Sequence, residues 1–153
     1  MAETFRFRRR VEFAETDMAG IVHFSNFLRM MEAAEHEFLR SLGSSVHVST
    51  AEGTTGWPRL KVGCEYFRPL RFEDWVEIEV KVVEVRTRSV RYAFEFWRDA
   101  VGQGERVARG EVVAVHTRVH PVEGLKAESI PARLREALLA RVEVLPQVQG
   151  QGD

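Results

Sequence analysis

Residues 27–42 read FLRMMEAAEHEFLRSL, and Gly43 follows them. The apolar residues of this stretch recur three and four positions apart: Phe27, Met30, Met31, Ala34, Phe38 and Leu42. This spacing puts them on one broad face of an α-helix. Ser25 or Asn26 can cap the helix start, and a glycine commonly follows the last turn. The pattern predicts one long helix whose apolar face lies deep against a sheet.

Much of the remaining chain alternates apolar and polar side chains, as half-buried strands do. The predicted strands cover residues 5–13, 60–67, 76–82, 90–96 and 107–119, with a hairpin turn at 99–104 and a short second helix after Pro131. Residues 44–58 are rich in Ser, Thr and Gly, which predicts a loop. One helix followed by consecutive strands predicts an α+β fold with an antiparallel sheet. The order argues against a doubly wound nucleotide-binding fold.

The length and charge of the chain narrow the classes of protein that it can belong to. With 153 residues, 44% of them hydrophobic, the chain suits one globular domain over residues 1–145 and a flexible tail over 146–153. The net charge of −1 favours neither nucleic acid nor a membrane surface as partner. One cysteine, no signal peptide and no long apolar segment predict a cytoplasmic protein.

A loop just before the long helix carries the most informative carboxylate. Residues 15–27 read ETDMAGIVHFSNF, so Asp17 lies among small residues shortly before the helix start. A carboxylate supplies a base or a nucleophile, and free backbone N–H groups at a helix start stabilise an oxygen that becomes negative. The alternative is a turn aspartate that binds its own loop backbone.

The remaining polar residues carry weaker signals of function. The five histidines are scattered, which predicts no metal site, and Cys64 lies in a strand pattern typical of a buried apolar residue. The glutamates of the helix, Glu32, Glu35 and Glu37, are expected on its polar face. Residues 8–10 are three arginines expected on a solvated strand face or edge.

A second group of arginines falls at the turn between two predicted strands. Arg86, Arg88 and Arg91 form this group, and arginine forks suit phosphate oxygens. Solvated surface arginines are the equal alternative. Lys61 and Arg68 are weaker candidates for the same role.

Several segments together resemble the hotdog-fold acyl-CoA thioesterases of the hydroxybenzoyl-CoA thioesterase-like family. They are the Asp17 loop through Val22, the helix entry at Asn26, the segment Tyr66-Phe67-Arg68-Pro69-Leu70, and the dipeptides His120-Pro121 and Ile130-Pro131. The resemblance implies a long central helix wrapped by a curved antiparallel sheet of about five strands. It also implies a homodimer or homotetramer whose active sites form at the interface between protomers.

The resemblance further implies roles for single residues. Asp17 would act as nucleophile or general base on an acyl-CoA or aroyl-CoA thioester, and the backbone N–H of Phe24 would polarise the thioester carbonyl. His23 and Asn26 would contact the substrate, and the arginine group at 86–91 would meet the nucleotide end. Coenzyme A is then part of the substrate, and no cofactor is expected. Relatives usually have Trp or Tyr where this chain has His23, and Tyr or His where it has Phe24. A backbone donor tolerates the change at position 24.

The motif leaves several alternatives open. Aromatic acyl groups, such as hydroxybenzoyl or dihydroxynaphthoyl, compete with aliphatic chains, and Trp57, Phe67 and Trp75 could line a pocket for either. A thioesterase acting on acyl carrier protein and a hydratase are further alternatives, although His36 only loosely imitates the histidine-bearing helix of hydratases. A non-catalytic acyl-binding scaffold would keep the fold without needing Asp17.

Overall fold

The computed structural model describes residues 4–99 and 104–143, and their helices and strands form two antiparallel sheets with two α-helices. The main sheet has the strand order β1 (Phe5–Arg10), β5 (Trp75–Val85), β6 (Ser89–Arg98), β7 (Glu105–Val115) and β4 (Arg59–Tyr66). The second sheet has the order β2 (Val48–Thr50), β3 (Gly53–Gly56), β8 (Thr117–His120) and β9 (Gly124–Ala127). The helices are α1 (Asn26–Ser41), α2 (Ala132–Leu139) and a short 3-10 helix, η1 (Phe13–Glu15).

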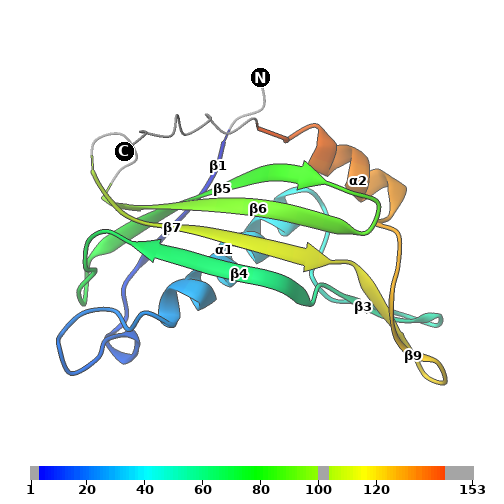
Figure 1. Ribbon diagram of the computed structural model, residues 1–153, viewed down its shortest axis with the longest axis horizontal. Helices are drawn as coiled ribbons and strands as arrows, with labels where there is room; N and C mark the ends of the chain where they lie inside the picture. The colour runs from blue at the N-terminus through cyan, green and yellow to red at the C-terminus, as the bar shows by residue number, and fades with distance from the viewer. Residues whose placement is uncertain (1–3, 100–103, 144–153) are drawn as a thin grey trace, which may run out of the picture.

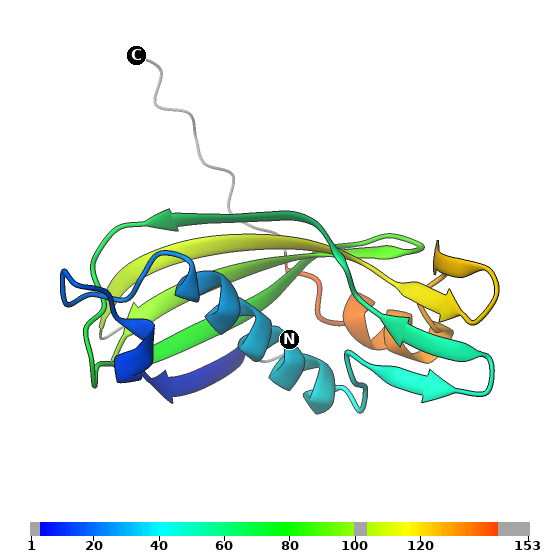
Figure 2. The ribbon, with the colours of Figure 1, turned by 90° about the horizontal axis from the view of Figure 1, so that it is seen from below.

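The long helix α1 lies across one face of the curved main sheet, and the other face of the sheet carries no helix (Figures 1 and 2). Five of the six residues of the predicted apolar face are buried, and Leu42 packs against the same core. Facing them are the inward residues of the central strands, including Ile78, Phe94 and Phe96. The long helix wrapped by an antiparallel sheet of five strands is therefore confirmed.

A glycine lets α1 approach the middle of the sheet. A Cβ atom built on Gly110 of β7 would lie 2.1 Å from Sδ of Met31, which is fully buried. Only a residue without a side chain fits between β7 and the helix at this point. Gly110 pairs with Phe94 on one side and with Cys64 on the other, so the contact fixes α1 above the centre of the sheet.

The second sheet is the largest difference from the sequence-based prediction. Residues 44–58, predicted as a loop, contain the strands β2 and β3. The single strand predicted over 107–119 is interrupted at the buried His116, where the chain leaves β7 and enters β8. Short polar strands such as Ser49–Thr50 carry no apolar alternation, which explains why the pattern missed them.

The two ends of the chain's described part lie against β5. The predicted strand over residues 5–13 ends at Arg10, and η1 begins at Phe13. The predicted second helix is present as α2, which buries Leu134 and Leu138 and contacts β5. The arginines of β1 lie on an edge strand, as expected: Arg8 and Arg10 stack on Trp75, and Arg9 pairs with Glu15.

Candidate active site

The Asp17 loop is a small hairpin that leads directly into α1. Thr16 and Val22 form an isolated antiparallel bridge, the N–H of Asp17 donates to the carbonyl of Ile21 at 2.9 Å, and the N–H of His23 donates to that of Glu15 at 2.9 Å. Gly20 closes the turn with a φ of 79°, a conformation that favours glycine. These bonds hold Asp17 next to the turn of the hairpin and the helix start at its base.

One oxygen of the Asp17 carboxylate is used by the loop and the other is available. Oδ1 accepts the N–H of Ala19 at 2.8 Å, as the turn alternative predicts. For Oδ2 no donor is found among residues 4–99 and 104–143. The side chain is half-buried. A loop contact of this kind orients the carboxylate while leaving one oxygen free for chemistry.

The N–H of Phe24, just before the helix start, is a backbone donor without a partner among the described residues. The carbonyl of His23 accepts the N–H of Asn26 at 2.9 Å and so points along the helix. Because a trans peptide group directs its N–H opposite to its C=O, the N–H of Phe24 points out of the helix start. No acceptor for it is found within the described part of the chain. The positive end of the helix dipole adds to its field.

The side chains beside this donor bind one another or the loop. Nδ1 of His23 lies 2.7 Å from Oγ of Ser25 and accepts the Ser25 N–H at 3.3 Å. Ser25 is the N-cap residue, one of the two expected, but its side chain makes no capping hydrogen bond, and its own N–H donates to the imidazole of His23. The Asn26 side chain donates to the Glu15 carbonyl at 2.8 Å, which ties the helix start to the hairpin.

Tyr66, which precedes the Phe67-Arg68-Pro69-Leu70 segment, contacts the residue just before the helix start. Its hydroxyl donates to the carbonyl oxygen of Phe24 at 2.8 Å. The ring of Phe24 is 65% exposed and lies against the imidazole of His23, with centroids 4.4 Å apart. The only sequence signal for Tyr66 was its place directly before Phe67-Arg68-Pro69-Leu70.

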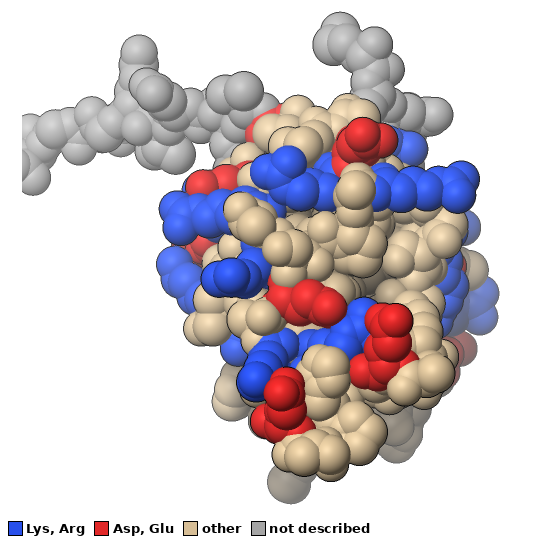
Figure 3. All heavy atoms as spheres, turned by 90° about the vertical axis from the view of Figure 1, so that its right-hand side faces the viewer, with Lys and Arg blue, Asp and Glu red and all other residues tan. Residues whose placement is uncertain are grey.

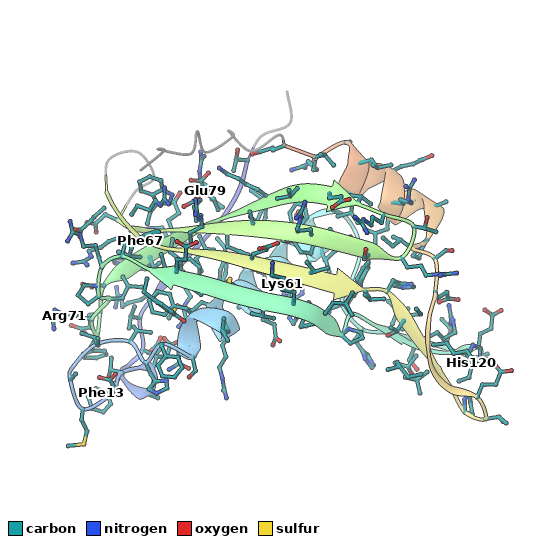
Figure 4. All side chains as sticks on the ribbon, in the orientation of Figure 1. Phe13, Lys61, Phe67, Arg71, Glu79 and His120 are labelled. Carbon is teal, nitrogen blue, oxygen red and sulfur yellow. The ribbon has the colours of Figure 1, made fainter. Side chains whose placement is uncertain are left out.

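Exposed apolar side chains surround the hairpin. Phe13 and Phe72 meet edge to face with centroids 5.7 Å apart, and Met18 at the tip of the turn is fully exposed. Phe13 and Phe67 lie at the same end of the molecule, whereas His120 lies at the opposite end (Figure 4). Exposed apolar groups next to a free carboxylate offer contacts to an amphipathic ligand or to a second protein chain.

The arginine group at residues 86–91 lies elsewhere in the same chain. Arg86 and Arg88 lie in the β5–β6 turn and Arg91 near the start of β6, at the opposite end of the main sheet from the Asp17 hairpin (Figure 1). Arg86 and Arg91 both pair with Glu84, at 2.8 Å and 3.2 Å, and the carbonyl of Arg88 accepts the N–H of His116. On this end of the molecule basic and acidic side chains are interspersed (Figure 3). Within one protomer, the arginine group and Asp17 are therefore far apart (Figure 1).

The aromatic residues considered for an acyl pocket are not gathered in one place. Trp57 is buried against His116, with centroids 5.0 Å apart. Trp75 is covered by two arginines of β1. Phe67 is half exposed beside Tyr66 and under the guanidinium of Arg106 at 4.8 Å. Of Trp57, Trp75 and Phe67, only Phe67 is adjacent in sequence to Tyr66.

The glutamates of α1 differ from expectation at one position. Glu32 and Glu37 are exposed, as predicted, but Glu35 is fully buried and its assignment to the polar face was wrong. Burial raises the pKa of Glu35, and a hydrogen bond from Arg59 opposes the rise. Arg59 also lies 3.9 Å from Glu32. The helical periodicity could not reveal that Glu35 is buried, because its partner Arg59 comes from a strand, β4.

Cys64 and the other titratable groups offer no competing catalytic centre. Cys64 is half-buried, less than expected, and burial raises the pKa of its thiol, which disfavours the nucleophilic thiolate. Within residues 4–99 and 104–143, no three His, Cys, Asp or Glu side chains come close enough to hold a metal ion. In the same described part, neither α-helix has the length and apolarity needed to cross a membrane.

Comparison with known proteins places this chain in a family. Residues 11–138 match the family model of the thioesterase-like superfamily. The chain is 27% identical to the 4-hydroxybenzoyl-CoA thioesterase of Pseudomonas sp., covering 86% of this chain and 95% of the relative. It is 26% identical to a 1,4-dihydroxy-2-naphthoyl-CoA hydrolase of Prochlorococcus marinus, covering 75% of each. A crystal structure from Aquifex aeolicus superposes with a TM-score of 0.75 at 32% identity, covering 88% of this chain and 98% of that one.

Proposed function

The chain belongs to the thioesterase-like superfamily, and from this membership we propose that it hydrolyses acyl-CoA or aroyl-CoA thioesters, with Asp17 and the Phe24 N–H in the central roles. Relatives named as thioesterases or hydrolases of CoA esters support the reaction class. The observation that carries the residue assignment is the pair of unused groups at the hairpin. These are the free Oδ2 of Asp17 and the free N–H of Phe24 just before α1.

In this proposal the thioester carbonyl lies between the two groups. Its oxygen accepts the N–H of Phe24 and gains further stabilisation from the helix dipole as it becomes negative. A single such donor contributes roughly 3 kcal/mol to the transition state. The side chain of residue 24 plays no part in this step, which accommodates a phenylalanine at that position.

Two routes follow from a carboxylate at this point. In the first, Asp17 attacks the carbonyl carbon, the C–S bond breaks, coenzyme A leaves as a thiolate, and water hydrolyses the mixed anhydride. In the second, Asp17 takes a proton from water, which attacks the same carbon and releases coenzyme A. Both consume one water molecule and need no cofactor. Reduction with borohydride separates them, because only the anhydride route converts Asp17 into homoserine.

A dimer through the edge strand β4 would complete this site. Leu60, Val62, Tyr66 and Phe67 are all exposed on or beside this edge, and an apolar edge strand invites pairing with another chain. Antiparallel pairing of two β4 strands brings opposite ends of two protomers together. The β5–β6 turn of one protomer, with its arginines, then approaches the Asp17 hairpin of the other, where it can meet the phosphates of coenzyme A.

The test is release of free thiol from a panel of aromatic and aliphatic acyl-CoAs, with Asp17→Asn as the variant. The amide keeps the oxygen that accepts the Ala19 N–H but removes the charge. We expect turnover of at least one acyl-CoA and a fall of a hundredfold or more in the variant, with an unchanged thermal unfolding midpoint. The acyl group that gives the highest kcat/KM identifies the substrate class.

Other outcomes would identify the alternatives. Survival of turnover within about threefold in Asp17→Asn would remove Asp17 from the mechanism. Faster release from acyl carrier protein than from any acyl-CoA would point to a carrier-protein thioesterase, and hydration of an enoyl-CoA to a hydratase. Binding of acyl-CoA without any release of thiol would mark a non-catalytic scaffold.

A further inference from the structure

We propose that Tyr66 is a positioning residue for the reaction: its hydroxyl holds the backbone of Phe24 so that the Phe24 N–H faces the thioester carbonyl. The inference rests on the proposed function and assigns a residue to it. The contact is the 2.8 Å hydrogen bond from the Tyr66 hydroxyl to the Phe24 carbonyl oxygen. It joins residues 42 positions apart in the chain and ties the end of β4 to the helix start.

The ring of Tyr66 is partly exposed but packs with one edge contact on a core residue. It meets Phe27 edge to face, with centroids 5.0 Å apart and an interplanar angle of 86°. Phe27 is buried and packs in turn on Phe96 of β6 at 5.4 Å. An anchored ring offers its hydroxyl at a fixed point and loses little side-chain entropy when it binds.

Phe24 itself has no comparable anchor in its side chain. Its ring is 65% exposed and contacts the imidazole of His23. Its backbone is fixed instead at two carbonyl groups. The carbonyl of His23, which shares a peptide plane with the Phe24 N–H, accepts the N–H of Asn26, and the Phe24 carbonyl accepts the hydroxyl of Tyr66.

Fixing the peptide planes on both sides of Phe24 fixes the direction of its N–H. Oxyanion donors work because they are already aimed at the developing charge, and small misplacements cost large factors in rate. The loss of the Tyr66 bond should therefore lower kcat more than it weakens substrate binding. Burial raises the pKa of Tyr66 to about 12, so its hydroxyl remains a donor throughout the pH range of an assay.

Tyr66→Phe removes the hydroxyl and keeps the ring on Phe27. The chain contains two tyrosines, and the other, Tyr92, provides a matched control because its buried hydroxyl has no partner in the part of the chain that the structure describes. We expect kcat to fall about tenfold in Tyr66→Phe with KM within about twofold. In Tyr92→Phe both should stay within about twofold of the native protein.

A second measurement reports on Phe24 directly. In protein labelled with ¹⁵N at its ten phenylalanines, the Phe24 amide signal is identified as the one that Phe24→Leu removes. Tyr66→Phe should shift or broaden this signal and speed its exchange with solvent, whereas Tyr92→Phe should not.

Different results would refute the positioning role of Tyr66 and the proposed function. An active native protein with unchanged kcat and an unchanged Phe24 signal in Tyr66→Phe would refute the positioning role and leave the proposed function standing. A rise in KM with constant kcat would also refute it, because it would mark Tyr66 as a binding residue. A native protein inactive towards every thioester would refute the proposed function, and the role of Tyr66 with it.

Discussion

Arg59 and Glu35 form an ion pair whose carboxylate is completely shielded from solvent. Nη2 of Arg59 lies 2.6 Å from Oε2 of Glu35, and its Nη1 donates to Oε1 at 2.9 Å. A buried carboxylate is costly unless a cation and hydrogen bonds compensate it. Arg59 begins β4 and Glu35 lies in α1, so the pair joins the helix to the edge of the main sheet.

Replacing Arg59 with methionine should destabilise the protein strongly at neutral pH. Glu35 would remain buried without its cation, and breaking one side of such a pair costs about 3–5 kcal/mol of unfolding free energy. Urea unfolding at pH 8 measures the loss. The control is Arg40→Met, which breaks a pair on the same helix with the same 2.6 Å distance, to Glu37, but on the exposed surface. It should change stability by less than about 1 kcal/mol.

The cost of Arg59→Met should also depend on pH in a definite direction. Burial raises the pKa of Glu35 above its ordinary value of 4.5, so the fold favours the protonated acid. The stability that this proton binding contributes is complete below pH 4.5 and is lost as the pH rises through the folded-state pKa. Without Arg59 that pKa rises further. The penalty should therefore shrink as the pH is lowered from 8 towards 5, and an equal penalty at both values would contradict this account.

Gly110→Ala should destabilise the contact between β7 and α1. The new methyl group would lie 2.1 Å from Sδ of Met31, which is buried and must shift. Overpacking of this kind costs about 1–3 kcal/mol, measurable by urea unfolding. Gly56→Ala is the control, because a Cβ there meets nothing within 4 Å. Adding Met31→Ala to Gly110→Ala should cost less than the sum of the two single changes.

Phe24→Pro should abolish most of the activity, whereas Phe24→Ala should keep it. Proline lacks the N–H that the proposed mechanism requires, and at position 24, one residue before the N-cap Ser25, it removes no hydrogen bond within the helix. Loss of the donor should lower kcat about a hundredfold or more. Alanine keeps the donor, so its kcat should stay within about tenfold. If Phe24→Pro and Phe24→Ala both fold and have equal kcat values, the backbone N–H of residue 24 is not the donor.

Leu60→Lys should convert the proposed dimer into monomers and remove activity with it. Leu60 is 72% exposed on the edge strand β4, and a lysine there opposes strand pairing. Sedimentation velocity measures the oligomeric state. Val122→Lys is the matched control, since Val122 is 95% exposed but follows β8, away from the β4 edge. A monomeric native protein with full activity would contradict the dimeric site.

The main elements of the fold could be predicted because their apolar residues follow a period. The helical spacing over residues 27–42 and the alternation around Val80 and Phe94 each identify one element. The second sheet could not be predicted in this way. Its strands are short and polar, and they are defined by pairing with β8 across about 60 residues of sequence, as in the pair Thr55–Arg118.

The candidate site shows the same contrast between residues with a local sequence signal and residues brought together from distant segments. Asp17 could be selected from the sequence because it lies in a small-residue loop beside a helix start. The partners that β4 supplies could not, because they come from a distant segment: Tyr66 reaches Phe24 before the helix, and Arg59 reaches Glu35 in the middle of α1. The burial of Glu35 also has no local signal, since its neighbours Glu32 and Glu37 are both exposed.

In the proposed mechanism the donor at residue 24 belongs to the backbone, and this has a consequence for changing the substrate range. The exposed ring of Phe24 is free to change while the N–H stays in place. Position 24 can therefore be exchanged to favour different acyl groups without rebuilding the reaction centre, which makes it the first position to randomise when new substrates are sought. Proline is the one residue that such a library should exclude.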